Sequence, residues 1–149
     1  MKSAYIETRP KTIFLVSSIV TIHYNEFGSE FCFDGEQHNF WEMVYVDSGN
    51  IVAITDGNSS TLSQGQIIFH EPNEIHAHIS DSESPNNMLV ISFSCESPDM
   101  NFFRKTIFTA DKTTKTLLGL FVSEVKSALG SIPDEYGKEE TLDFSKAEF

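Results

Sequence analysis

The chain has 149 residues and a mass of 16.8 kDa, which is enough for one domain with a complete core. Hydrophobic residues make up 40% of the sequence and charged residues 21%, so the composition excludes a disordered chain. Asp and Glu outnumber Lys and Arg by 22 to 10, and the net charge of -12 opposes direct binding to the phosphate backbone of a nucleic acid.

Charge is unevenly distributed along the chain. No Lys or Arg lies between Lys11 and Arg104, whereas carboxylates are frequent there. All five histidines lie in the same stretch and are the only side chains there that can become cationic: His23, His38, His70, His76 and His78. A pocket formed by this stretch is expected to prefer a metal ion, a cationic ligand or a neutral polyol to a phosphate or a carboxylate.

Short β-rich runs separated by turn residues extend from about residue 12 to residue 95, without helical periodicity. The expected strands are 17–24, 30–33, 41–46, 51–55, 59–62, 66–69, 75–79 and 88–94. Asp56-Gly57 is a strong signal for a two-residue hairpin of type I′, because both residues tolerate a positive φ. Strands of this length at spacings of about 8 to 12 residues predict a sandwich or a small barrel.

Helices are expected only after these strands. Ser97, Pro98 and Asp99 supply the N-cap, the early proline and the early acid of a helix start. Apolar residues then recur at helical spacing from Leu117 to Leu129, and the glycine that follows is expected to end this helix.

The predicted plan therefore has three parts. Residues 1–96 are expected to form the β-barrel, and residues 97–130 a helical segment that packs on the barrel or at a dimer interface. Residues 131–149 are polar and acidic without an apolar period, which predicts a linker or tail.

Cys32 and Cys95 lie in apolar surroundings without a CxxC spacing, so we expect two buried free thiols in a reducing compartment. The N-terminal residues lack the apolar segment of a signal peptide, and no apolar run is long enough to cross a membrane. A cytoplasmic protein without a membrane partner is therefore expected.

Four residues are the best candidates for a ligand site: Glu36, His38, Glu42 and His76. They occur in the patterns Glu36-x-His38-x3-Glu42-x6-Gly49 and Gly65-x6-Pro72-x3-His76. In an extended strand the first three would face one side, and a later strand could bring His76 opposite them. Two imidazoles with one or two carboxylates suit a metal or a polar ligand. The alternative is that His38 and Glu42 form a polar pair in the barrel mouth without any ligand.

Other side chains rank below this set. His70, His76 and His78 share parity, but His70 precedes the turn at Pro72 and His78 need not share its surroundings, so a three-histidine cluster is the weaker candidate. Trp41 and Tyr45 have the opposite parity to the Glu42 side chain and are expected to pack against the following helices.

The two-part pattern resembles the two motifs of cupins. Three phrases extend the resemblance to the N-terminal sensor domain of AraC-type transcription regulators, over about residues 15 to 130: QHNFWEMVYVDSGN, DGNSSTLSQGQIIFHEPNEIHAH and MLVISFSCESPDMNFFRKTIF. The resemblance implies a mainly β fold, a cupin-type double-stranded β-barrel (jelly roll) followed by C-terminal α-helices. It also implies a small-molecule effector in the barrel, a homodimer formed through the helices, and DNA binding only through a C-terminal helix-turn-helix domain that this chain does not contain.

Two departures from the family pattern bear on function. Metal-binding cupins begin the first motif with His-x-His, and Glu36 stands at the first position here, which leaves a three-ligand or carboxylate-rich site. No cofactor is therefore expected, although a divalent metal at His38, Glu42 and His76 is allowed. Nothing after Gly130 resembles a helix-turn-helix pair.

The sequence thus predicts a regulatory domain that senses a neutral or cationic small molecule and is not an enzyme. A stand-alone metal-dependent cupin enzyme, such as a dioxygenase or a sugar isomerase with His38, Glu42 and His76 as ligands, is the main alternative. A dimerisation module with an empty barrel is the third.

Overall fold

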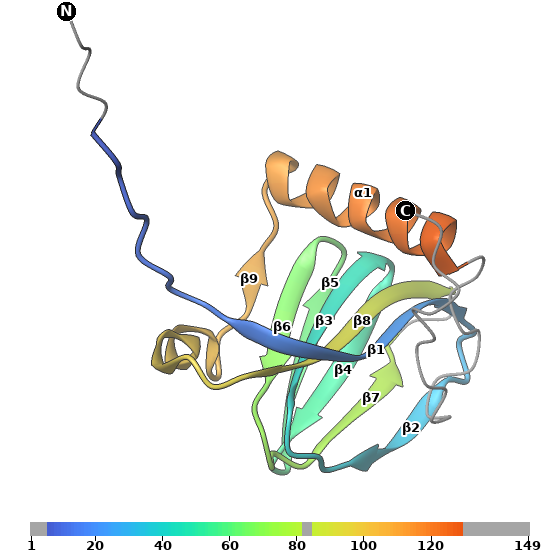
Figure 1. Cartoon of the computed structure of the whole chain (residues 1–149). Helices are drawn as coiled ribbons and strands as arrows, with labels where there is room; N and C mark the ends of the chain where they lie inside the picture. The colour runs from blue at the N-terminus through green and yellow to red at the C-terminus, as the bar shows by residue number, and fades with distance from the viewer. Residues whose placement is uncertain (1–5, 82–84, 130–149) are drawn as a thin grey trace, which may run out of the picture.

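Figure 1 shows the computed structural model of the chain, which describes residues 6–81 and 85–129. Its elements in chain order are β1 (Val16–Phe27), β2 (Cys32–Glu36), β3 (Trp41–Ser48), β4 (Asn50–Thr55), β5 (Asn58–Ser63), β6 (Gln66–His70), β7 (His76–Ser80), β8 (Asn86–Cys95), the 3₁₀-helix η1 (Pro98–Phe103), β9 (Phe108–Thr109) and α1 (Lys112–Leu129). All eight predicted strands are present, with ends displaced by a few residues.

The strands form two antiparallel sheets. One has the order β1-β8-β3-β6-β9 and the other the order β2-β7-β4-β5, and α1 lies across one end of the barrel against the five-stranded sheet (Figure 1). The predicted mainly β fold with a helix after the strands is therefore confirmed. The two-residue strand β9 was not predicted, because so short a segment shows no period.

The core lies between the two sheets. Val44 and Val46 of β3 share one apolar cluster with Ile51 of β4 and Leu62 of β5, and all four side chains are 0% exposed. Because side chains alternate along a strand, the two valines place every second residue of β3 inside the barrel. This interior face of β3 also carries Glu42 of the candidate site.

The opposite face of β3 is apolar too. Tyr45 is clustered with Leu89 of β8 and Val125 of α1, and Trp41 is clustered with Met100 of η1. The prediction that Trp41 and Tyr45 pack against the following helices is confirmed. β3 therefore contacts the barrel interior on one face and the two helices on the other.

The hairpin between β4 and β5 has the predicted turn. Asp56 and Gly57 have φ values of 46° and 79°, and Thr55 pairs with Asn58 across the turn. Positive φ at both central residues is the property of a type I′ turn, whose twist matches that of the flanking strands.

Gly49, between β3 and β4, also has a positive φ, +74°. A Cβ there would lie 2.8 Å from the Asn86 Cβ, so both conformation and space require glycine. We expect Gly49→Ala to lower the free energy of unfolding by about 1–2 kcal/mol from the backbone alone. Gly28→Ala is the control, since its Cβ would meet nothing within 4 Å. Urea denaturation measures both, and equal losses would contradict the argument.

The helix α1 begins at Lys112, ahead of the first residue of the apolar period. The Asp111 Oδ1 accepts a hydrogen bond of 2.7 Å from the Thr114 backbone N–H, which is an N-cap contact. The apolar period missed this first turn because its residues are polar. Gly130 and the predicted tail 131–149 lie outside the described residues, and within the described ranges no helix is long and apolar enough to cross a membrane.

The expected helix at Ser97 is present as the 3₁₀-helix η1. Ser97 occupies the N-cap position without a capping side-chain hydrogen bond, and its Oγ instead accepts from the Leu15 backbone N–H at 3.0 Å. The serine therefore ties the N-terminal segment to the end of β8.

The cysteines differ in their surroundings. Cys95 is buried and Cys32 is exposed, and both are free thiols. The expectation that Cys32 is buried was wrong. Among the residues that the structure describes, β2 is at the edge of its sheet and pairs only with β7, so the apolar neighbours of Cys32 in the sequence do not place its own side chain in the core.

Candidate ligand and metal site

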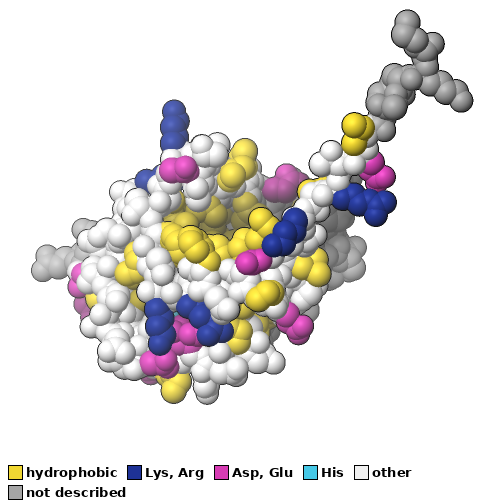
Figure 2. All heavy atoms as spheres, turned by 90° about the vertical axis from the view of Figure 1, so that its left-hand side faces the viewer, with side chains coloured by type: hydrophobic (Ala, Val, Ile, Leu, Met, Phe, Trp, Pro, Cys, Tyr) yellow, Lys and Arg dark blue, Asp and Glu magenta, His cyan; other side chains and the backbone are white. Residues whose placement is uncertain are grey.

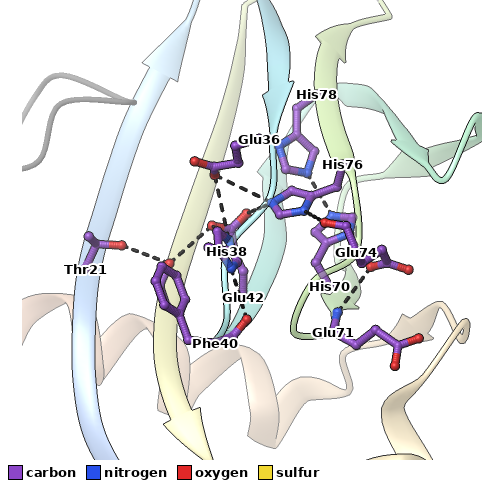
Figure 3. A network of polar contacts seen from close by, with 11 residues as sticks. Thr21, Glu36, His38, Phe40, Glu42, His70, Glu71, Glu74, His76 and His78 are labelled. Carbon is purple, nitrogen blue, oxygen red and sulfur yellow. Dashed lines mark hydrogen bonds and ion pairs between the residues drawn. The ribbon is translucent and has the colours of Figure 1, made fainter.

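The four candidate residues converge inside the barrel (Figure 3). Glu36 is the last residue of β2, His38 lies in the link to β3, Glu42 is on β3, and His76 begins β7. The expectation that the first three share one strand was wrong, because the chain crosses from one sheet to the other between Glu36 and Glu42. The expectation that a later strand brings His76 opposite was met, since Glu36 and His76 are register partners of β2 and β7.

The distances between their polar atoms are short. His76 Nε2 lies 3.5 Å from Glu36 Oε1 and 3.6 Å from Glu42 Oε1. His38 Nε2 lies 3.9 Å from Glu36 Oε1 and 3.7 Å from Glu42 Oε2. Ligand atoms about 2.1 Å from a common metal ion are about 3.0–3.4 Å apart, so a small contraction of this group would complete a coordination sphere.

Both imidazole rings are held in the orientation that metal binding requires. His38 Nδ1 lies 3.0 Å from the Phe40 carbonyl oxygen, and His76 Nδ1 lies 3.0 Å from the Glu74 carbonyl oxygen. A carbonyl oxygen only accepts, so each Nδ1 carries a proton and each Nε2 is left to face the site. Backbone carbonyls play this part around histidine ligands of metals.

Three polar atoms of the site have no hydrogen-bond partner although they are buried: His38 Nε2, Glu42 Oε1 and His76 Nε2. Buried polar atoms are normally paired, because leaving one unpaired costs about 1–3 kcal/mol. The other oxygen of Glu42 accepts a 3.2 Å hydrogen bond from Ser92 Oγ, which fixes the carboxylate on the barrel wall. The unpaired atoms are therefore the ones that a ligand or metal would satisfy.

Burial and the neighbouring charges set the ionisation of the site. Burial alone would raise the pKa of Glu42, but the His38 and His76 rings hold that pKa well below its ordinary value. Burial would lower the pKa of His76, but the Glu36 and Glu42 carboxylates raise that pKa to about 10. Burial lowers the pKa of His78 to about 3. At neutral pH, before any metal binds, Glu42 is anionic, His76 is cationic and His78 is neutral.

This donor set fits a divalent metal ion. Each of the four residues offers one nitrogen or oxygen, and these atoms all lie within 4.8 Å of one another. Mixed imidazole and carboxylate ligands suit Mn²⁺, Fe²⁺, Co²⁺ and Zn²⁺. The stretch that forms the barrel contains no Lys or Arg. A bound cation would replace the His76 proton and balance the charges of Glu36 and Glu42.

The weaker candidate of the sequence, the three-histidine cluster, is also assembled. His70 and His78 are 0% exposed, and the His70 ring stacks on the His76 ring with centroids 4.2 Å apart. His70 was expected to lie apart because it precedes a turn. The turn between β6 and β7 instead returns the chain so that all three rings point into the barrel (Figure 3).

Ser92 and Glu74 were not identified from the sequence. Ser92 is one of two serines in the run MLVISFS and shows no motif. Glu74 could have been found from its place four residues after His70 and two before His76, because its carboxylate lies beside the His70 ring and its backbone carbonyl beside the His76 ring.

Residues 21–92 match the cupin domain family, so the barrel is a cupin domain and the jelly-roll expectation is confirmed. This fold is consistent with a domain that binds small molecules. No curated protein sequence matches the chain.

Several solved structures are similar to this chain at low sequence identity. ToxT from Vibrio cholerae, solved with a bound unsaturated fatty acid, is 10% identical with a TM-score of 0.52, over 73% of this chain and 47% of ToxT. A predicted oxalate decarboxylase from Thermotoga maritima is 16% identical with a TM-score of 0.45, over 46% of this chain and 61% of that one. An RmlC-like cupin from Shewanella frigidimarina is 15% identical with a TM-score of 0.44, over 52% and 69%. The chain therefore spans about half the length of ToxT and about three fifths of the decarboxylase-like protein.

Proposed function

We propose that this chain is the ligand-sensing domain of an AraC-type transcription regulator, and that it binds a small molecule in the barrel at Glu36, His38, Glu42 and His76. The observation that carries the proposal is the group of three buried polar atoms that have no hydrogen bond and face one another there. His76 Nε2 and Glu42 Oε1 form an ion pair at 3.6 Å but no hydrogen bond, so a ligand can still supply their missing partner. The stretch without Lys or Arg favours a neutral or cationic effector over an anionic one.

The two faces of β3 supply a route from ligand to partner. Glu42 reaches into the barrel, and Tyr45, three residues later, lies in the cluster that includes Val125 of α1. A ligand that binds Glu42 shifts β3, and this shift changes the position in which α1 packs against the sheet. Regulation is then a shift between two arrangements of the helix, set by the difference in ligand affinity between them.

The surface beside the helices is suited to a second copy of the chain. Phe102 of η1 is 70% exposed, and Leu117 and Leu120 of α1 are 60% and 62% exposed. Figure 2 shows apolar side chains around a hollow on the side of the molecule that carries η1 and β9. Exposed apolar residues of this kind mark interaction sites. We assign a homodimer to this face, with DNA bound by a separate domain in the cytoplasm.

Thermal unfolding with added ligand tests the sensor. Wild type and Glu42→Ala, purified without affinity metal, are screened against neutral polyols and cationic metabolites. A ligand at a hundred times its Kd stabilises the folded state by about 2.7 kcal/mol. We expect the rise in Tm that follows from this stabilisation in the wild type alone. Glu26→Ala on the exposed face of β1 is the matched control and should respond like the wild type. Tight binding of a sugar phosphate would contradict the charge argument.

A metal-dependent cupin enzyme is the second candidate, and the fixed orientation of His38 and His76 favours it. When bound, a divalent metal would supply Lewis-acid or oxygen chemistry, while Glu36 and Glu42 would hold it and orient a substrate. Turnover of a sugar or an oxidisable substrate by metal-loaded wild type, absent in the His76→Ala variant, would decide for the enzyme. Stoichiometric metal with ligand binding but no turnover would decide for a metal-assisted sensor.

A further inference from the structure

A second group of metal-type ligands lies beside the first. His70 of β6 and His78 of β7 are both 0% exposed, and their Nε2 atoms are 3.0 Å apart. One oxygen of Glu42 lies within 4.8 Å of both nitrogens. Without a cation, the two nitrogens share a hydrogen bond, which offsets the cost of burying both rings.

The His70 ring has the orientation of a metal ligand. Its Nδ1 lies 3.1 Å from Glu74 Oε2, and a carboxylate oxygen accepts, so Nδ1 carries the proton and Nε2 offers its lone pair to the barrel. The same Glu74 oxygen accepts from the Glu71 backbone N–H at 3.1 Å, which fixes the carboxylate (Figure 3). A carboxylate behind a histidine is a common support for a metal-bound ring.

The separation of the two rings matches a shared cation. Two nitrogen ligands about 2.1 Å from one ion, at an angle of about 90°, lie about 3.0 Å apart. His70 and His78 already have this separation, whereas the first group must contract. A cation to the side of the line between the two nitrogens would replace the single N–H···N contact with two metal–nitrogen bonds, and the proton that His78 holds on Nε2 in this contact would move to its Nδ1.

We infer that the barrel holds two divalent transition-metal ions, the second bound by His70, His78 and Glu42, with Glu42 as the bridge between them. This inference rests on the proposed use of the barrel as a binding site. Glu42 is the one residue common to both ligand groups, and the two oxygens of a carboxylate can serve two ions about 3.5–4 Å apart. The stacked rings of His70 and His76 place the two groups side by side. Imidazole-rich ligands select Zn²⁺ or Co²⁺ over Mg²⁺ or Ca²⁺.

Co²⁺ titration of the full chain, stripped with a chelator and dialysed, tests this inference. Visible absorption and elemental analysis report the number of bound ions. We expect two per chain in the wild type, one in His78→Gln, and one in Glu36→Gln, whose loss affects only the first group. His23→Gln is the matched control, because His23 is a buried histidine outside both groups, and it should keep two.

Mn²⁺ loading gives a second measurement that needs no variant. Two ions bridged by Glu42 should give the electron paramagnetic resonance spectrum of a spin-coupled pair, even if His78→Gln does not fold. A single bound ion with the spectrum of isolated Mn²⁺, and the same count in His78→Gln, would overturn the second site. That result would not contradict the proposed sensor function. The absence of any ligand effect on Tm would contradict the sensor function and would not change the number of bound ions.

Discussion

Replacing Glu42 by Gln should weaken Co²⁺ binding to the barrel by about 100-fold or more, since loss of a supporting group behind a ligand already costs about 10- to 100-fold and Glu42 is proposed as a ligand itself. The variant keeps the shape of the side chain and removes its charge. It also removes a donor atom from both metal-type groups, so the effect should exceed that of any other single substitution in the site. Isothermal titration of chelator-treated protein measures the change in Kd.

Two variants control this result. Glu26→Gln makes the same charge change at an exposed position of β1 and should leave Kd unchanged. Ser92→Ala removes only the hydroxyl that donates to Glu42 Oε2, and we expect a loss of about 10-fold. Metal affinity in Glu42→Gln equal to that of the wild type would show that the carboxylate is a structural partner of His76 and not a ligand.

The sequence pattern predicted through its spacing that Glu36, His38, Glu42 and His76 come together, although part of the geometric reason was wrong. Parity along one strand was expected to align Glu36, His38 and Glu42. In the structure, His38 lies in the link between two sheets and is held there by the Asn73 backbone N–H, which donates to the His38 carbonyl oxygen at 2.6 Å. The spacing of the motif allows its residues to meet across the link between the two sheets. The periodicity along one strand does not reveal that link.

The second group could not be ranked from the sequence because it depends on a turn and on long-range register. Asn73 has a φ of 67°, which helps to reverse the chain between β6 and β7 and brings His70 against His78. Asn adopts this conformation more readily than most residues, so the turn itself was predictable. Which faces of the two strands then meet is decided by pairing with β3 and β4, far away in the sequence.

The strands were predicted well because buried β-strands and their glycine-containing turns leave strong local signals, as at Asp56 and Gly57. Elements decided by distant contacts were missed. β9 exists because Phe108 and Thr109 pair with β6, and Cys32 is exposed because β2 is an edge strand. The residues next to β9 and next to Cys32 in the sequence do not indicate either feature.

Leu62→Ala should lower the free energy of unfolding by about 2–5 kcal/mol, the range for removing a buried leucine side chain. Leu62 is 0% exposed and belongs to the cluster that joins the two sheets, so the lost methyl groups leave a cavity between β3 and β5. A domain of this size has a total stability of about 5–15 kcal/mol, which makes this a large fraction. Urea denaturation should show a lower midpoint with an unchanged slope.

The matched control for this change is Leu15→Ala just before β1, where the leucine is 65% exposed and the loss should stay within about 0.5 kcal/mol. Leu62 belongs to neither group of metal-type ligands, so folded Leu62→Ala should still bind Co²⁺ with wild-type stoichiometry. Glu42→Gln, in contrast, should bind Co²⁺ more weakly than the wild type. If Leu62→Ala loses its metal while still folded, the ligand groups depend on the apolar core for their geometry and are not held by their hydrogen bonds to Phe40, Glu74 and Ser92 alone.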